Sequence, residues 1–570
     1  MASPPHSPSP STLTRYLPIL GWLPKYRSEW LRADIIAGLT VWAVMVPEAM
    51  AYAGIAGVPA LYGLYTVPVP LFAYAIFGTS RTLIVGPDTA TAMISATAIG
   101  GLAAVGSAQF IGLTATLAFL VGLLFFLFSF LRMGWIANFV PTPVMKGFIQ
   151  GLVWVTILGQ VPKIIGIDGG HGQFFGRLTT LFKEAPNADG LTTLVGLGSL
   201  VILFVMKKKM PRVPAALVTL VVAILAVNAW GLEAKGLNVV ENISTGLPAL
   251  AMPVFGWQEI ETLLPAAFAI VLLGFSETLG AARAAAERTG EVLDPNQELL
   301  SHGPVNVGSA FCSGFIAVGS LSKTSVAMSA GAKTQLCSLV AGVLVILSLL
   351  FLMPLFHGLP HATLAAIVIE AMLGLASFTY LKNLRRVNLL EFGVACIAFW
   401  GVLFFGVLPG IGLGVALSLI LLVRSDSAPP MAVLGKLPGH EMYRDIRKHP
   451  EAETISGLVI FRFDHALTYT NASTFEEGVR SFLLRAESPV RQVLVDAEGI
   501  TDIDTTSMEM LARLRRELAN RKIILAFARV RDEVFERLKL ADFDSKNIYQ
   551  RITDGVLTFE TNAKSPLRQG

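Results

Sequence analysis

The sequence predicts a polytopic α-helical membrane protein that carries a small cytoplasmic α/β domain at its C-terminus. Of its 570 residues, 53% are hydrophobic and only 15% are charged, whereas soluble domains carry about 25% charged residues. Long apolar runs follow one another from Ile35 to Val423, and the alternating strand and helix patterns of a soluble domain follow them. The bilayer is therefore the expected solvent for most of the chain.

The apolar runs predict fourteen transmembrane segments, two of them short. A membrane-spanning helix needs about 20 apolar residues, and glycine and proline interrupt several of the runs. We place the segments near residues 35–53, 61–78, 87–102, 109–131, 143–160, 190–206, 213–230, 263–282, 299–315, 321–332, 334–353, 362–380, 388–405 and 408–423.

The distribution of cations predicts that both termini are cytoplasmic. Four cations precede the first run, which favours an internal N-terminus without a cleavable signal peptide. With an even number of spans, the expected inner loops contain Arg81, Arg132, Lys207, Lys208, Lys209, Arg212, Arg283, Arg288, Lys382, Arg385 and Arg386. The expected outer loops contain only Lys163, Arg177, Lys183 and Lys235. This bias toward positive inner loops is the one that membrane proteins show.

Composition divides the chain into four parts. Residues 1–32 form an N-terminal tail and lead-in, whose first part is rich in proline and serine and is expected to be disordered. Residues 33–424 form the transmembrane domain, residues 425–440 a polar linker, and residues 441–570 the α/β domain. In this last part strands are predicted at 458–463, 492–496 and 523–527, and helices at 471–486, 504–521 and 532–541.

Two membrane segments are broken, with an extended part before a half-helix. The first is extended over 78–87 and helical from Asp88, and the second is extended over 314–320 and helical from Leu321. They are the third and the tenth segment, so they hold the same place in two halves of seven. We therefore predict 7+7 inverted repeats whose half-helices meet near the bilayer midplane.

The starts of the half-helices predict an anion site. Helix N-termini present free N–H groups and a positive dipole end, and non-helical backbone at membrane depth is tolerated where it lines a cavity. The candidate substrate-binding residues are Thr89, Thr91, Ser320, Ser322, Lys323 and Thr324. Two alternatives remain open: the hydroxyls can bond to helix carbonyls or pack helices together, and Lys323 can extend to the membrane interface.

Two carboxylates lie inside apolar runs, Glu48 and Glu277. A carboxylate in the membrane is costly and indicates a functional site, so both are candidates for proton coupling. The alternative for each is a structural ion pair with Lys323 or a capping role. Asp88 fits a helix N-cap, and Glu370 is a weaker third candidate because it lies near a helix end.

No enzyme chemistry is expected. The three cysteines, Cys312, Cys337 and Cys396, lie in apolar runs without a CxxC spacing or a nearby histidine cluster. The sequence contains no nucleotide-binding loop, metal cluster or nucleophile motif. We therefore expect no catalytic activity, no metal, no cofactor and no nucleic-acid partner; the net charge of +4 is small and by itself says nothing about nucleic acid.

Several motifs in order resemble the sulfate permease (SulP) family of anion transporters. They are VPEAMAYA at 46–53, AGVP at 56–59, YGLY at 62–65, GTSR at 78–81, VGP at 85–87, FSE at 275–277, NQEL at 296–299 and GSLSKT at 319–324. The C-terminal domain resembles the STAS domain that members of the family carry. Many members have glutamine in place of Glu48 and arginine in place of Lys323.

The resemblance implies a fold and a function. It implies fourteen helices divided into core and gate bundles, homodimers, and an elevator-type movement in the inner (plasma) membrane of a bacterium. It implies sulfate, bicarbonate, chloride or small dicarboxylates as substrates, and Glu277 matches a carboxylate tied to proton coupling in some members. In the STAS domain it implies a regulatory site at Asp504, Thr505, Thr506 and Ser507, with a plain N-cap at Asp504 as the alternative.

The leading hypothesis is therefore a secondary active transporter that moves a small anion, with sulfate as the first candidate, by symport with H⁺. A sodium-coupled bicarbonate transporter or an uncoupled anion exchanger would keep the fold and change the coupling. A membrane sensor that signals through the STAS domain is the alternative from another class, although such a sensor would not need two broken helices.

Overall fold

The computed structural model describes residues 12–170, 172–210, 213–240, 246–250, 252–253, 256–376, 378–486, 488–541 and 543–564. The first eleven residues of the predicted tail, and Arg212 of the predicted inner loops, lie outside these ranges. The chain divides into two compact units, Met1–Ser418 and Leu419–Gly570. Each unit is described by itself.

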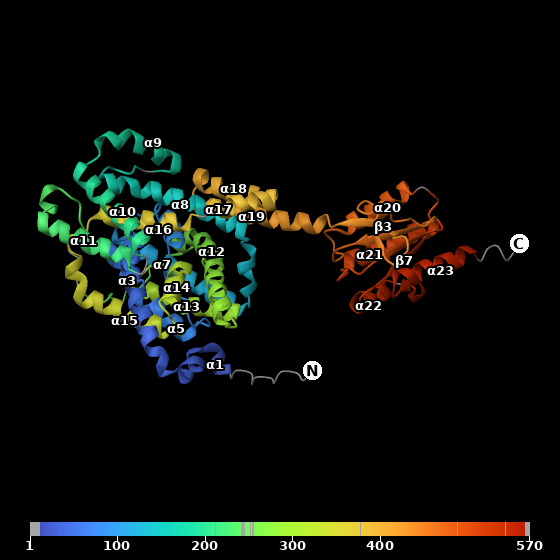
Figure 1. The fold of residues 1–570 in the computed structure, drawn as a ribbon, viewed down its shortest axis with the longest axis horizontal. Coiled ribbons are helices and arrows are strands. Elements are labelled where there is room, and N and C mark those ends of the chain that lie inside the picture. The colour runs from blue at the N-terminus through green and yellow to red at the C-terminus, as the bar shows by residue number, and fades with distance from the viewer. Residues whose placement is uncertain are drawn as a thin grey trace. The chain divides into compact units, whose positions relative to one another are not determined.

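The N-terminal unit is helical (Figure 1). Its longer helices are α3 (Leu31–Ala56), α5 (Pro68–Phe77), α6 (Thr89–Ile99), α7 (Ala108–Phe130), α8 (Thr142–Ile165), α9 (Phe174–Glu184), α10 (Gly190–Lys209), α11 (Ala215–Trp230), α12 (Trp257–Thr289), α13 (Pro295–Phe311), α14 (Leu321–Ser329), α15 (Leu336–Leu347), α16 (His361–Leu375), α17 (Phe378–Val387), α18 (Leu389–Phe405) and α19 (Val407–Ser427). Short α1 (Thr12–Tyr16), α2 (Ile19–Trp22) and α4 (Ala60–Tyr65), and the 3₁₀-helix η3 (Gly134–Phe139), complete the elements used below.

Among the described residues, nine helical runs are long and apolar enough to cross a membrane, and α6, α11 and α18 are shorter apolar helices. The polytopic helical membrane fold is confirmed. The number of fourteen segments stays a prediction.

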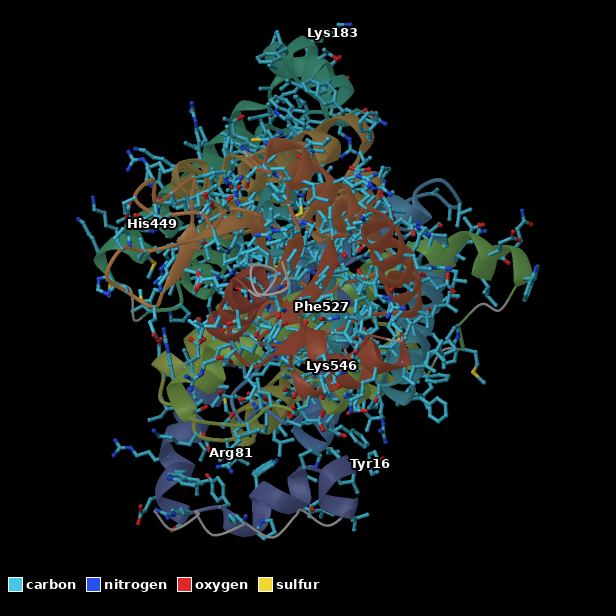
Figure 2. The ribbon with its side chains drawn as sticks, turned by 90° about the vertical axis from the view of Figure 1, so that its right-hand side faces the viewer. Tyr16, Arg81, Lys183, His449, Phe527 and Lys546 are labelled. Carbon is cyan, nitrogen blue, oxygen red and sulfur yellow. The ribbon has the colours of Figure 1, made fainter. Side chains whose placement is uncertain are left out.

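The helices of this unit pack in two groups, which we call the core bundle (α3 to α7 and α12 to α15) and the gate bundle (α8, α10, α16 and α18). In Figure 1 the labels of the gate bundle lie above those of α5, α13, α14 and α15. Figure 2 agrees with this arrangement. Lys183 of α9, the helix after α8, lies at the top of that view, and Arg81, which follows α5, lies in its lower part. The predicted division into core and gate bundles is therefore visible in the packing.

The helix pairs in contact also repeat in the way that two related halves require. Helix α7 packs on α13 as α15 packs on α5. In the same way, α8 packs on α18 as α16 packs on α10. Likewise α3 packs on α14 and α12 packs on α6. Exchanging the first and the second half of the predicted segments turns each pair into its counterpart. This pattern supports the predicted 7+7 repeats.

The two broken segments are extended before they are helical, as predicted. Strand β1 (Val85–Pro87) precedes α6, and strand β2 (Ala317–Gly319) precedes α14. The strands pair antiparallel in the register Val85↔Gly319, Gly86↔Val318 and Pro87↔Ala317. This pairing, which was not predicted, joins the two halves of the fold at their broken helices.

Close approach of helices in the gate bundle depends on Gly147. A Cβ atom at this position would lie 2.1 Å from the backbone oxygen of Ala395 in α18. We expect Gly147→Ala to lower the free energy of unfolding by about 2 kcal/mol, because an extra methyl group in a packed interface forces the backbones apart. Thermal unfolding of the purified protein measures the loss. Gly198→Ala in α10, where nothing lies within 4 Å of the added Cβ, is the matched control and should be neutral or stabilising.

The C-terminal unit is a six-stranded sheet in the order β4-β3-β5-β6-β7-β8. Strands β5 to β8 are parallel, and β3 is antiparallel to both β4 and β5. The elements are β3 (Met431–Lys436), β4 (Tyr443–Asp445), β5 (Leu458–Phe463), α20 (Ala472–Arg485), β6 (Gln492–Asp496), α21 (Thr505–Asn520), β7 (Ile524–Ala528), α22 (Asp532–Leu540), β8 (Ile548–Tyr549) and α23 (Ile552–Lys564). The three predicted strands and three predicted helices are all present.

Apolar residues on both faces of this sheet explain the fold of the C-terminal unit. Phe461 and Val493 pack with α20, α21 and α22, whereas Ile460 and Leu494 pack with α23 on the other face. Parallel strands buried on both faces have continuous apolar sequences rather than alternating ones, which is why they were visible in the sequence.

The prediction of a linker over 425–440 is corrected by the structure. Helix α19 continues to Ser427, and β3 begins at Met431. The end of α19 is bound to the α/β domain, since Asn471 Nδ2 donates to the backbone oxygen of Asp426 at 3.0 Å and Thr474 Oγ1 donates to that of Ser427 at 2.8 Å. Polar and proline residues suggested a linker, but Met431 pairs with β5 in register and so belongs to the sheet.

Candidate functional site

Side chains of the core bundle form hydrogen bonds with the backbone N–H and C=O groups of β2. Asn306 of α13 binds both polar groups of Ala317: its Oδ1 accepts from the backbone nitrogen at 2.9 Å, and its Nδ2 donates to the backbone oxygen at 3.0 Å. Thr278 Oγ1 of α12 accepts from Gly319 N at 2.8 Å. Backbone groups outside a helix need such partners where water is absent. The strand is therefore held in one position.

The backbone around β1 is held from the other half of the fold. Gln335 Nε2 donates to the backbone oxygens of Ser80 and Leu83, at 2.9 and 2.8 Å. Thr324 Oγ1 accepts from Ile84 N at 3.0 Å. Thr324, a predicted substrate-binding residue, is thus a structural contact between α14 and the approach to β1.

Helices α6 and α14 begin directly after the paired strands, and residues at both helix starts line one cavity. Asp88 is the N-cap of α6, as predicted, and its carboxylate accepts from Ala90 N at 2.9 Å. Ser320 is the N-cap of α14. A helix leaves its first N–H groups without partners inside the helix, and the positive ends of two helix dipoles meet here.

A cavity of about 460 Å³ lies at these helix starts. Its lining includes hydroxyl and charged side chains from both bundles: Asp88, Ser320, Ser322, Glu48 and Glu277 from the core bundle, and Lys146, Lys207 and Glu370 from the gate bundle. The two hydroxyls, Ser320 Oγ and Ser322 Oγ, are 3.1 Å apart. The volume and the N–H and hydroxyl donors at the helix starts fit a small anion.

The other predicted hydroxyls, those of Thr89, Thr91 and Thr324, are not among the residues that line the cavity. Thr89 and Thr91 are buried, and Thr91 Oγ1 donates to the backbone oxygen of Asp88 at 3.3 Å. Bonding of this kind to a preceding carbonyl is the structural alternative that the sequence left open. The structure thus places Ser320 and Ser322 in the lining of the cavity, whereas Thr89, Thr91, Lys323 and Thr324 are not among its lining residues.

Lys323 does not extend to the membrane interface. Its side chain is 2% exposed, and its Nζ lies 3.1 Å from Glu48 Oε2 in α3. The Nζ also donates to the backbone oxygen of Pro87 at 3.1 Å and lies 5.0 Å from the centre of the Tyr52 ring. The structural ion pair with Lys323 is therefore present for Glu48, and the ammonium holds α14 against α3 and β1.

Glu277 faces the cavity from α12 and is half-buried. Asp88 of α6 and Lys146 of α8 are the charged groups that act on it electrostatically. Glu370 forms an ion pair with Lys207 inside the gate bundle. In the sequence, Lys207 indicates only the topology of the chain, and Lys146 does not stand out. A cation in an apolar run does not reveal which residues will surround it in the fold.

In the C-terminal domain the predicted N-cap at Asp504 is present. Its carboxylate accepts from Ser507 N at 2.8 Å and from Tyr469 N at 2.7 Å. Desolvation works against the ionised form of Asp504, but these hydrogen bonds and Arg537 outweigh it and hold the pKa below its usual value. Ser507 is buried, whereas Thr505 and Thr506 are exposed.

Sequence comparison places known families on both units. The sulfate permease family matches residues 31–398, and the STAS domain matches residues 449–556. A protein named probable sulfate transporter from Mycobacterium tuberculosis is 33% identical over 549 residues, which cover 95% of this chain and 98% of that protein. The chloroplastic sulfate transporter 4.1 of Arabidopsis thaliana is 33% identical over 534 residues, covering 91% of this chain and 78% of that protein.

Solved structures share the fold. The murine Solute Carrier 26 family member A9 anion transporter, in its inward-facing state, superposes with a TM-score of 0.89 at 21% identity, covering 98% of this chain and 96% of that one. The transmembrane domain of the cyanobacterial bicarbonate transporter BicA superposes with a TM-score of 0.59 at 25% identity, covering 69% of this chain and 98% of that one. The likeness at 21% identity supports the architecture alone.

Proposed function

Because the chain belongs to the sulfate permease family, we propose that it carries sulfate across the membrane by symport with H⁺. That the protein is an anion transporter follows from the family. Sulfate as the substrate and the proton as the coupling ion are the parts that we propose. The curated relatives named as sulfate transporters support the choice of sulfate.

The observation that carries this proposal is the pair of half-helix N-termini at a cavity with hydroxyl donors. Ser320 and Ser322 line that cavity, and β1 and β2 hold both helix starts in place. An oxyanion gains from N–H and O–H donors that are already oriented. Lys323 adds little net charge, because Glu48 compensates it at 3.1 Å.

The charge around the cavity explains why a proton would accompany the anion. Asp88 and Glu277 line the cavity together with the N-termini of α6 and α14. A doubly charged anion next to an ionised Glu277 is repelled, whereas protonation of that carboxylate removes the repulsion. Binding of the anion and binding of the proton therefore favour each other.

We assign the transport step to a movement of the core bundle against the gate bundle. All the backbone that forms the anion site, β1 with α6 and β2 with α14, belongs to the core bundle, whereas Lys146, Lys207 and Glu370 form the facing wall. The site can therefore move as one body while its facing wall stays in place. This arrangement is the one that an elevator-type mechanism needs.

The proposed setting is the plasma membrane of a bacterium, with both termini in the cytoplasm and the chain assembled as a homodimer. The cations in the expected inner loops support the orientation, and the bacterial relative supports the membrane. We propose that the STAS domain regulates transport or stabilises the dimer.

A second candidate function is bicarbonate transport, which the likeness to the BicA transmembrane domain favours. Uptake of labelled sulfate, bicarbonate and fumarate into proteoliposomes, with and without an inward proton gradient, separates the candidates. We expect sulfate to accumulate above its equilibrium level only with the gradient. Accumulation of bicarbonate with a sodium gradient instead would replace sulfate–proton symport, and exchange without any gradient would indicate an uncoupled exchanger.

A further inference from the structure

Three charged side chains of the cavity, Glu48, Lys207 and Glu370, form ion pairs inside their own bundle. Glu48 and Lys323, from α3 and α14, form an ion pair inside the core bundle. Lys207 and Glu370, from α10 and α16, form one inside the gate bundle. Neither pair needs to break when one bundle moves against the other.

Three charged side chains of the cavity remain after this pairing: Asp88, which caps α6, and the oppositely charged Glu277 and Lys146. Glu277 and Lys146 both line it, and within the described part of the chain neither forms an ion pair within 4.0 Å. Glu277 lies in α12 of the core bundle, and Lys146 lies in α8 of the gate bundle. They therefore line one cavity from opposite sides of the boundary along which the bundles would move.

We propose that Lys146 and Glu277 form an electrostatic latch between the bundles, closed while Glu277 is ionised and opened when it takes up a proton. This inference rests on the proposed function and names the residue that would link the proton to the movement. The ionised carboxylate is attracted to the ammonium and holds the core bundle in the present position. The neutral acid loses that attraction, so the loaded core bundle is free to move.

Other charged groups near Glu277 do not replace Lys146 in this role. Asp88 lies in the core bundle, like Glu277, and caps α6 by accepting a hydrogen bond from Ala90 N. From α13, His302 lies behind Thr278, with Nε2 3.4 Å from Thr278 Oγ1, and is fully buried. The remaining charges of the cavity belong to the two pairs within the bundles. Of the two gate-bundle cations that line the cavity, Lys207 is paired with Glu370, and Lys146 has no ion pair within 4.0 Å among the described residues.

The latch also gives the coupling a direction. When the anion is absent, the attraction between an ionised Glu277 and Lys146 slows the return of the empty core bundle but does not prevent it, so the transport cycle can be completed. When anion and proton are both bound, the acid is neutral, the pair is open and the movement carries both. Without Lys146, the movement no longer depends on this attraction, and the pH dependence that remains is the one that protonation of Glu277 gives to binding of the anion.

The test is the pH dependence of transport in the full-length protein, with sulfate as the probe. Wild type, Lys146→Gln and Lys146→Arg are reconstituted, and sulfate uptake and counterflow are measured over an acidic to alkaline series. We expect uptake by wild type and Lys146→Arg to fall as the pH rises. For Lys146→Gln we expect the midpoint to move to higher pH by about one unit, because a nearby cation no longer favours the ionised carboxylate.

Lys208→Gln is the matched control, because this cation follows Lys207 in α10 but does not line the cavity. Its midpoint should equal that of wild type. In a Glu277→Gln background, adding Lys146→Gln should change counterflow no further, which tests the pair even if the single Lys146→Gln variant folds poorly.

Two results would overturn the latch and they are distinguishable. If wild type shows proton-dependent uptake and Lys146→Gln keeps the wild-type midpoint, or Lys208→Gln shifts as much, the latch is wrong and the symport stands. If wild type shows no proton dependence with any of the anions, the proposed symport and the latch fail together.

Discussion

Replacing Glu277 by glutamine is expected to abolish sulfate uptake driven by a proton gradient while the protein still folds. The amide keeps the shape of the carboxylate but cannot take up or release a proton. Since Glu277 is half-buried in the wall of the cavity, its amide can still be hydrated there. We therefore expect gradient-driven uptake to fall to the background level, with counterflow of sulfate retained.

Two further measurements make this result specific. Stabilisation of the purified protein by sulfate against heat should persist in Glu277→Gln, because the donors at the helix starts remain. Glu287→Gln, an exposed position of the same helix α12, is the matched control and should keep wild-type uptake. Unchanged gradient-driven uptake in Glu277→Gln would remove this carboxylate from the mechanism.

Replacing Lys323 by methionine is expected to abolish sulfate uptake and to destabilise the protein by roughly 3 kcal/mol, as removal of one partner of a buried pair does. The Lys323 side chain is 2% exposed and its ammonium pairs with Glu48, so its loss leaves a carboxylate without its counter-charge beside the anion site. That carboxylate both lacks a partner and repels the substrate. Thermal unfolding and sulfate uptake measure the two effects.

The double variant Lys323→Met with Glu48→Gln separates charge from packing. It restores neutrality, so most of the lost stability should return, and the two substitutions should be strongly non-additive. Lys333→Met, an exposed cation in the loop after α14, is the control and should behave as wild type. A Lys323→Met protein as stable as wild type would show that the pair contributes nothing measurable.

Much of this site could be predicted because its signals are local in the sequence. The breaks before Asp88 and Leu321 are visible as extended, glycine-containing stretches ahead of helical ones, and Glu277 stands out as a charge in an apolar run. The N-caps at Asp88 and Asp504 are confirmed for the same reason, since a cap depends on residues three positions away at most.

Which of the six predicted residues can contact the substrate depends on how segments far apart in the sequence pack together. Thr324 bonds to the backbone of Ile84, and Thr91 bonds to that of Asp88. A hydroxyl near a helix start is equally suited to a ligand and to a backbone group, and only the positions of neighbouring segments decide between them. The same limit applies to the stretch over 425–440, where β3 forms because β5 offers it a partner.

By itself, the sequence determined the polytopic helical membrane fold, the α/β domain that follows it, the two broken segments and the family. Each of these depends on hydropathy, periodicity or motifs within a few tens of residues. Only the tertiary structure decided that β1 pairs with β2, that Lys323 neutralises Glu48, and that Lys146 and Glu277 line one cavity from different bundles. The physical reason is that charges and backbone groups at membrane depth must find partners, and in this fold those partners lie far away along the chain.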